Sequence, residues 1–287
     1  MILELNDIYK QFRRRPVLDH INWTIETPTT IALVAPNGTG KSTLLNVITN
    51  LETKDGGTVS ILGRPNTDPS IYADMTFMQD SAVLFPEMTG MAHMQLIAQR
   101  YHVTKVRLAD VIERTGIGNF LNKSVGNYSM GMKQLLLFAM AIMPEPKLMF
   151  LDEPLNGLDP KAIVMLRETL QEMGAAGTTI LFSSHNLDEI DRLTDNVVFL
   201  HQGQLIPAST DAVQRYEIVM DSAASVLKQT PWQSHIETIL SPDKVAISAT
   251  PEQIKKLQAK YRVFDVVLTH HSTEHQYFQL FGENQIH

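Results

Sequence analysis

Residues 35–43, with the sequence APNGTGKST, gather glycines, a lysine and hydroxyl side chains that could hold a phosphate chain. An apolar run precedes the segment and the amphipathic run LLNVITNL follows it. Glycines let the backbone wrap round phosphates, and a following helix N-terminus adds positive potential. We therefore predict a nucleotide phosphate loop in which Lys41 neutralises the outer phosphates and the Ser42 hydroxyl ligates Mg²⁺. The residues predicted to contact the nucleotide here are Asn37, Gly38, Thr39, Gly40, Lys41, Ser42 and Thr43.

Ala35 departs from the usual pattern of such a loop, which begins with glycine. If this position requires a positive φ, alanine costs about 1–2 kcal/mol. If φ is negative, alanine costs little.

Two carboxylates and a histidine follow other apolar runs. Residues 148–154 read LMFLDEP and place Asp152 and Glu153 at the end of a hydrophobic strand. His185 lies in LFSSHNLDEID, directly after a further apolar strand. Downstream of a phosphate loop, such groups could bind a metal ion, prepare a water molecule and contact a terminal phosphate.

The ordered set of these segments over residues 1–205 resembles the nucleotide-binding subunits of ABC transporters. The resemblance implies that Asp152 holds Mg²⁺, that Glu153 is the general base, and that His185 contacts the γ-phosphate of ATP. It also implies that Gln79, in FMQDSAVLFPEMTG, senses Mg²⁺ and water, while its flanking residues contact the membrane subunit.

The segment 128–134, YSMGMKQ, resembles the signature segment LSGGQ of that family. The resemblance implies that Ser129 and Gly131 bind the γ-phosphate held by an opposite subunit, and that Asp159, in the segment NGLD, lies at the dimer interface. The residues that depart from the usual signature are Tyr128, Met130, Met132 and Leu135.

The adenine ring is expected to stack on an aromatic side chain near the N-terminus. Phe12 lies where the family usually has this aromatic residue, and Tyr9 is an alternative because stacking tolerates either ring.

The pattern of apolar runs predicts an α/β fold with a largely parallel sheet. We predict buried strands at 29–35, 148–152, 178–184 and 196–200, with antiparallel strands at 1–8 and 17–27. We expect a P-loop NTPase core with an N-terminal antiparallel β subdomain, a helical insertion at 86–145 and a small C-terminal α+β appendage. The predicted domains are therefore an ATPase cassette, 1–205, and a C-terminal domain, 206–287.

The C-terminal segment shows helix signals but no catalytic constellation. Thr250, Pro251 and Gln253 form a predicted capping box, and Ser272 is expected to open a last helix. The histidines at 270, 271, 275 and 287 have no metal-site spacing and are interpreted as solvated. The end of the chain, STEHQYFQLFGE, resembles ATPase subunits of the ABC-2 export class.

Composition limits the partners. The net charge is −7 and the only basic cluster is Arg13–Arg15, so we expect no nucleic-acid binding. The chain has no cysteine, which agrees with a reducing compartment.

The opening residues MILELNDIYK lack the pattern of a signal peptide, and no run approaches the ~20 apolar residues of a membrane span. We therefore expect a cytoplasmic protein, bound to the inner membrane face through a separate permease.

The resemblance implies ATP and Mg²⁺ as ligands, a homodimer or heterodimer of cassettes, and ATP-driven export. Two alternatives remain open. One is a hydrolysis-poor regulatory cassette in a heterodimer, which Ala35 and the altered signature would suit. The other is an ABC ATPase that works without a permease, although such proteins typically carry tandem cassettes or long coiled-coil arms.

Overall fold

A six-stranded sheet forms the centre of the first part of the chain, in a computed structural model that describes residues 1–208, 214–270 and 273–282. Its strand order is β10-β9-β3-β8-β7-β6. β3, β6, β7, β8 and β9 pair in parallel. Parallel strands are covered on both faces, which explains their continuous apolar runs. The bounds are β3 Thr30–Val34, β6 Met75–Met78, β7 Leu148–Leu151, β8 Thr179–Ser183, β9 Val197–His201 and β10 Gln204–Pro207. The predicted α/β class and its four buried strands are confirmed.

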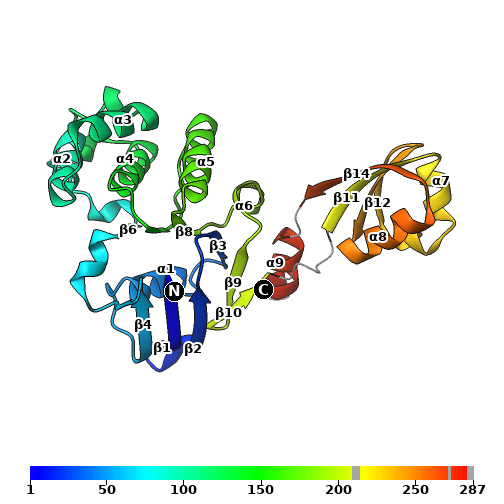
Figure 1. The fold of residues 1–287 in the computed structure, drawn as a ribbon, viewed down its shortest axis with the longest axis horizontal. Helices are drawn as coiled ribbons and strands as arrows, with labels where there is room; N and C mark the ends of the chain where they lie inside the picture. The colour runs from blue at the N-terminus through cyan, green and yellow to red at the C-terminus, as the bar shows by residue number, and fades with distance from the viewer. Residues whose placement is uncertain (209–213, 271–272, 283–287) are drawn as a thin grey trace. The chain divides into compact units, whose positions relative to one another are not determined.

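A second sheet near the N-terminus has the strand order β2-β1-β4-β5. Its strands are β1 Leu3–Phe12, β2 Arg15–Ile25, β4 Gly56–Ile61 and β5 Arg64–Pro65, all paired antiparallel. The sequence predicted β1 and β2 but not β4, because the glycine pair that begins β4 suggests a turn. Helix α1, Lys41–Ile48, lies between the two sheets and buries four apolar side chains, so it joins them in one core (Figure 1).

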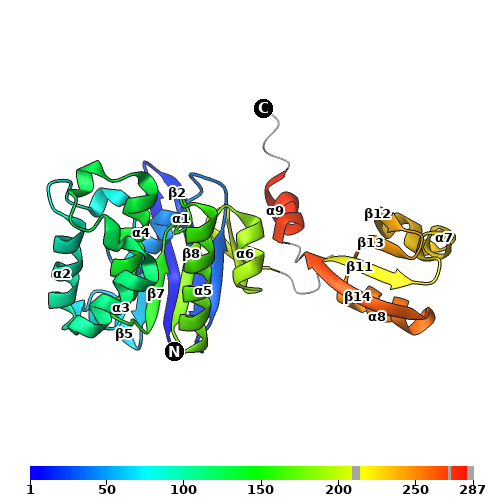
Figure 2. The same cartoon turned by 90° about the horizontal axis from the view of Figure 1, so that it is seen from above.

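Helices cover the other face of the central sheet. α4 and α5 lie along this face, and α2 and α3 pack beside α4 (Figures 1 and 2). Short 3₁₀ turns lie in the connections of this part of the chain. The bounds are η1 Pro69–Ala73, η2 Ser81–Val83, α2 Gly90–Arg100, α3 Lys105–Thr115, η3 Ile117–Asn119, η4 Val125–Asn127, α4 Met130–Ile142, α5 Pro160–Ala175 and α6 Leu187–Leu193. Residues 86–145 are thus helical, between strands β6 and β7.

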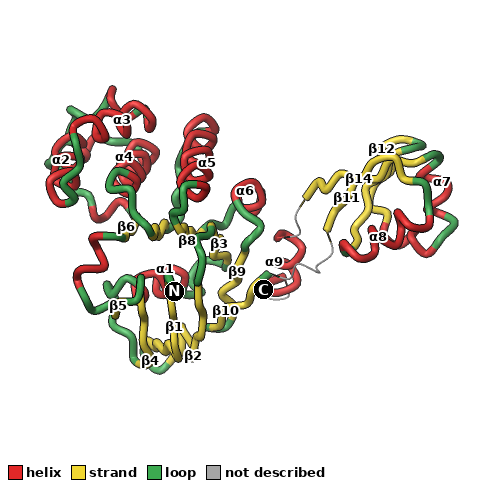
Figure 3. The backbone as a smooth tube through the Cα atoms, viewed as in Figure 1, coloured by secondary structure: helices red, strands yellow, loops and turns green. Residues whose placement is uncertain are grey.

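The chain divides into two compact units, one made of Met1–Asn186 with Arg192–Ile206 and the other of Leu187–Asp191 with Pro207–His287. The second unit contains an antiparallel sheet of order β12-β13-β11-β14, with helices α7 and α8 packed on it (Figure 3). Its elements are β11 Gln214–Met220, α7 Ala223–Lys228, η5 Pro231–His235, β12 Ile236–Ser241, β13 Lys244–Ala249, α8 Pro251–Lys260, β14 Val263–His270 and α9 Thr273–Phe281.

The predicted capping box before α8 is confirmed: the Thr250 side chain accepts from the amide of Gln253, and the Gln253 side chain accepts from the amide of Thr250. The last helix is also present and begins at Thr273. Ser272 and the histidines at 270, 271, 275 and 287 lie outside the residues or side chains that the structure describes. Within the described ranges, no helix combines the length and apolar character that crossing a membrane requires.

Candidate functional site

The glycine loop connects the buried strand β3 to helix α1 through left-handed backbone. Gly38 has a φ of 78° and Gly40 a φ of 110°. A Cβ atom at Gly40 would lie 2.6 Å from Cγ1 of Val17, so this position admits only glycine unless the Val17 side chain shifts. Ala35 is buried and is not one of the described residues with positive φ. Alanine therefore costs little at the position where glycine is usual.

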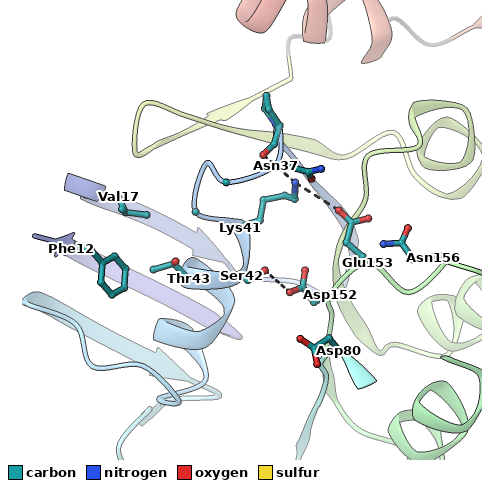
Figure 4. Close-up of a pocket in the computed structure, with 13 residues that line it drawn as sticks. Phe12, Val17, Asn37, Lys41, Ser42, Thr43, Asp80, Asp152, Glu153 and Asn156 are labelled. Carbon is teal, nitrogen blue, oxygen red and sulfur yellow. Dashed lines mark hydrogen bonds and ion pairs between the residues drawn. The ribbon is translucent and has the colours of Figure 1, made fainter. Parts of the chain in front are cut away.

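Lys41 is the first residue of α1 and is 7% exposed. Its ammonium donates a hydrogen bond of 2.5 Å to the carbonyl oxygen of Ala35, at the start of the same loop. It also lies 3.7 Å from Oε1 of Glu153. Burial lowers the pKa of Lys41 from its ordinary value, and the neighbouring carboxylates Glu153 and Asp152 oppose that shift. The loop thus holds a buried cation whose nearest charged neighbour is a carboxylate (Figure 4).

Asp152 follows the last residue of β7 and joins two elements. Its Oδ2 accepts a hydrogen bond of 2.6 Å from the hydroxyl of Ser42, and its Oδ1 accepts one of 2.6 Å from the hydroxyl of Ser183. A hydroxyl and a carboxylate at this distance form part of the oxygen ligand set that Mg²⁺ prefers. The residues present therefore fit a magnesium ion held by Ser42 and Asp152.

The side chain of Glu153 lies between a cation and an imidazole. Its Oε2 is 2.9 Å from Nδ1 of His185, whose side chain is 61% exposed, and its Oε1 faces Lys41. The strands β7 and β8 are parallel neighbours, so the residues that follow them reach the same edge of the sheet. A carboxylate held this way can accept a proton from water, and the histidine can fix its orientation.

A cleft of about 510 Å³ runs along these residues (Figure 4). It brings together most of the predicted loop with Phe12, Asp152 and Glu153. Its lining consists of Phe12, Val17, Pro36, Asn37, Gly38, Gly40, Lys41, Ser42, Thr43, Asp80, Asp152, Glu153 and Asn156. Thr39 is predicted to contact the nucleotide but lies outside this lining, and its hydroxyl donates to the carbonyl oxygen of Pro36 at 2.8 Å.

Phe12, at the end of β1, is half-exposed and lines the cleft, with the ammonium of Lys10 4.9 Å from its ring centroid. Tyr9 is stacked on His20 with a centroid distance of 5.1 Å and is not part of the lining among the described residues. Of the two candidate aromatic residues, only Phe12 therefore presents its ring to the cleft.

Gln79 lies apart from this cleft, whereas its neighbour Asp80 lines it. Gln79 instead lines a second, mostly apolar cavity of about 230 Å³. Asp80 caps η2, with its carboxylate accepting a hydrogen bond of 2.6 Å from the amide of Ala82, and it lies near Asp152 in the lining of the cleft (Figure 4). Because adjacent residues of extended backbone project to opposite sides, Gln79 faces away. Sequence reasoning missed Asp80, and its acidic side chain beside Gln79 was the available signal.

The signature segment and the segment at Asp159 lie against each other on one surface of the chain. Ser129 caps α4 by accepting from the amide of Met132 at 3.2 Å, and Asp159 caps α5 by accepting from the amide of Ala162 at 2.8 Å. A Cβ atom at Gly131 would lie 2.7 Å from the carbonyl oxygen of Gly157, so only glycine fits there. Ser129, Gly131 and Asp159 lie outside the lining of this chain's own cleft, within the part of the chain that the structure describes.

Comparison with known proteins places this geometry in a family context. A sequence model described as "ABC transporter" matches residues 18–156. The lantibiotic transport ATP-binding protein SrtF of Streptococcus pyogenes is 31% identical over 205 residues, covering 71% of this chain and 89% of SrtF. The uncharacterized ABC transporter ATP-binding protein YhcH of Bacillus subtilis is 28% identical, and the aligned region covers 99% of this chain and 97% of YhcH. A solved structure described as the ATP binding subunit of an ABC transporter is similar with a TM-score of 0.68 and 30% identity, covering 74% of this chain and 91% of its own.

Proposed function

Since this chain belongs to the ABC transporter family of ATP-binding subunits, we propose that it couples ATP hydrolysis in the cleft described above to export through a separate membrane permease. The observation that carries the proposal is the arrangement of Lys41, Asp152 and Glu153 around the glycine loop. A buried cation, a metal-binding carboxylate and a carboxylate beside a histidine are the groups that phosphoryl transfer to water requires.

Each group has a role that follows from its contacts. Lys41 would neutralise phosphate charge. A bound phosphate chain would compete with Glu153 for the ammonium of Lys41. Glu153 would accept a proton from the attacking water. His185, at 2.9 Å from Glu153, would orient that carboxylate and contact the terminal phosphate. Catalysis is then mostly positioning and charge stabilisation.

Ser42 and Asp152 are the residues of this chain that would hold Mg²⁺. When bound, the ion neutralises charge on phosphate oxygens. Gln79 stays a proposed sensor of the ion and water, although it lies outside the cleft lining; its recruitment would require a change of the turn at Asp80.

Phe12 is the proposed stacking partner of adenine, since its ring is the one that faces the cleft. Stacking of a base on an aromatic side chain is worth about 1–3 kcal/mol. This contact would anchor the base while the loop residues hold the phosphates.

A second cassette would complete the site. Ser129 and Gly131 present a helix N-terminus that can bind a phosphate, yet neither lines the cleft of its own chain. Met130 beside them is 61% exposed. These features support a dimer in which each signature segment, with Asp159 nearby, contacts ATP held by the other subunit. The partner would be a second copy of this chain or a different cassette.

The permease would dock at the second cavity, which is bordered by Gln79. Two of the apolar side chains that line it are largely exposed, Leu51 at 52% and Val83 at 45%. Exposed apolar groups of this kind typify interaction sites. Docking here would place the chain at the cytoplasmic face of the membrane and would connect the permease to the loop that contains Gln79 and Asp80.

The similarity to SrtF supports a peptide as cargo, within the wider set of drugs, peptides, lipids and polysaccharides that exporters of this type carry. We keep the proposed division into a cassette, 1–205, and a C-terminal domain, 206–287. The alternative of a hydrolysis-poor regulatory cassette now depends on the altered signature, since Ala35 fits its position without strain.

A steady-state ATPase assay with added Mg²⁺ tests the proposal. We expect the wild-type protein to hydrolyse ATP and Glu153→Gln to bind ATP while losing turnover by at least about 100-fold. A wild type that binds ATP but turns over no faster than Glu153→Gln would instead indicate the regulatory cassette. If the wild type showed no Mg²⁺-dependent nucleotide binding, and if Lys41→Met made no difference to nucleotide binding, the proposed ATPase function would be overturned.

A further inference from the structure

Glu153 has a φ of 49°, in the left-handed region that non-glycine residues rarely adopt. Such strained backbone persists only where the surroundings determine it, and it is concentrated at functional sites. The direction of a side chain depends on the backbone that carries it. The contacts that hold the Glu153 backbone therefore decide where its carboxylate points.

The hydroxyl of Ser183 holds the amide of Glu153. Ser183 is the last residue of β8 and is fully buried. Its Oγ accepts a hydrogen bond of 2.8 Å from the amide of Glu153 and donates one of 2.6 Å to Oδ1 of Asp152. Because the single hydroxyl proton goes to Asp152, the Oγ lone pairs are directed to the amide of Glu153.

The side chain of Gln134 holds the carbonyl of Glu153. Gln134 lies on α4 and is 6% exposed. Its Nε2 donates a hydrogen bond of 2.8 Å to the carbonyl oxygen of Glu153. Both main-chain groups of Glu153 are thus bound by buried side chains, and the two side chains come from different elements. One of these elements, α4, is capped by the signature residue Ser129.

We propose that Ser183 and Gln134 are positioning residues that lock the backbone of Glu153 in its left-handed conformation and so aim its carboxylate at the water to be activated. The proposal rests on the proposed ATPase function. It also gives Gln134 a second role, since any displacement of α4 when the signature segment binds ATP passes to the carbonyl of Glu153.

The two residues should affect turnover and spare ATP binding. Neither side chain lines the cleft in the described part of the chain. Losing either hydrogen bond lets the Glu153 backbone leave the strained region, and a misplaced reactive group lowers kcat by about 10- to 100-fold. At saturating Mg²⁺ the KM for ATP should stay within about twofold, because the loop and Phe12 are untouched; the saturating ion offsets the hydrogen bond to Asp152 that Ser183→Ala also removes.

The experiment measures kcat, KM for ATP and melting temperature for Gln134→Met and Ser183→Ala in the full-length protein. Gln171→Met is the matched control, because Gln171 also donates to a main-chain carbonyl, that of Arg192 at 3.1 Å, from an exposed position on α5. We expect a lower kcat with preserved KM for the first two variants and wild-type kinetics for the control. In a Glu153→Gln background, neither substitution should lower the residual rate further.

Gln134→Glu provides a readout that a merely structural role would not move. In this variant, the introduced carboxyl group can donate to the carbonyl of Glu153 when it is protonated, whereas its ionised form cannot. The kcat of Gln134→Glu relative to the wild type should therefore rise as pH falls.

The outcomes separate this inference from the proposed function. If the wild type hydrolyses ATP and Glu153→Gln abolishes turnover, but Gln134→Met and Ser183→Ala keep the wild-type kcat, the positioning role is wrong and the ATPase stands. A pH-independent ratio for Gln134→Glu also contradicts the positioning role, even if Gln134→Met fails to fold. A wild type without ATPase activity overturns both.

Discussion

The hydroxyl of Ser42 donates a 2.6 Å hydrogen bond to Oδ2 of Asp152, and this contact connects the first turn of α1 to the end of β7. The two residues are 110 positions apart in the chain, so the contact exists only because β3 and β7 both border β8 in one parallel sheet. It brings a neutral oxygen and an anionic oxygen to the same point of the cleft. The sheet thereby assembles the proposed metal site from the loop at one strand and the carboxylate at another.

Asp152→Asn should raise the Mg²⁺ requirement of the ATPase and should have a smaller effect on the affinity for ATP. The amide keeps the size of the side chain but removes the anionic charge that attracts the ion. We expect the Mg²⁺ concentration at half-maximal ATPase activity to rise by at least about tenfold, as for loss of a metal ligand. Titration of Mg²⁺ at fixed ATP measures this, and equal Mg²⁺ requirements in variant and wild type would contradict the assignment of Asp152.

Gly40→Ala should destabilise the protein and weaken nucleotide binding. The positive φ costs about 1–2 kcal/mol, and the 2.6 Å approach to Val17 adds a clash of about 1–3 kcal/mol. Gly177→Ala is the control, because Gly177 has a φ of 99° and no atom within 4 Å of the added Cβ. Denaturant unfolding should show the larger loss for Gly40→Ala, and only Gly40→Ala should lose ATP affinity. Equal losses would mean that the contact with Val17 relaxes freely.

The loop, the carboxylates and the buried strands could be predicted because each is indicated by a short, contiguous sequence pattern. A phosphate loop needs glycines and a lysine within a few residues, and a buried parallel strand needs an unbroken apolar run. No such pattern predicts that Asp80, and not its neighbour Gln79, lines the cleft. The orientation of these neighbours depends on how the turn at η2 is capped, which is a property of local geometry.

The contacts of Ser183 and Gln134 with Glu153 were equally inaccessible from sequence. They require the register between β7 and β8 and the position of α4, neither of which a linear pattern specifies. Strand β4 was missed for the opposite reason: its local signal, a glycine pair, indicates a turn, while pairing with β1 makes it a strand.

Phe12→Leu should weaken ATP binding by about 5- to 150-fold, the equivalent of about 1–3 kcal/mol of base stacking. Tyr9→Leu is the comparison, because Tyr9 stacks on His20 instead of lining the cleft. Binding of a fluorescent ATP analogue measures both. Phe12→Tyr should keep most of the affinity, since the ring is retained. A loss for Tyr9→Leu equal to that for Phe12→Leu would show that the stacking residue has been assigned wrongly.

Because Lys41 is buried, its contribution to the free energy of unfolding depends on pH in a defined direction. Its pKa in the folded protein is lowered from the ordinary value of 10.5. Between the lowered pKa and 10.5, the unfolded chain binds more protons than the folded chain at this residue, so its contribution to the free energy of unfolding rises with pH. Below the lowered pKa both states are protonated, and the unfavourable contribution is constant.

Comparing the wild type with Lys41→Met isolates this residue, because methionine keeps most of the side-chain volume and cannot titrate. Urea unfolding of the nucleotide-free proteins, at a series of pH values from about 7 to about 11, should show the wild type gaining stability relative to Lys41→Met as pH rises toward 10.5. The same variant should lose ATP affinity by about 2–5 kcal/mol, the usual result of removing one partner of a buried charge pair. A stability difference that stays flat over this range, or falls with pH, would mean that the ammonium of Lys41 is not disfavoured by burial in the folded protein.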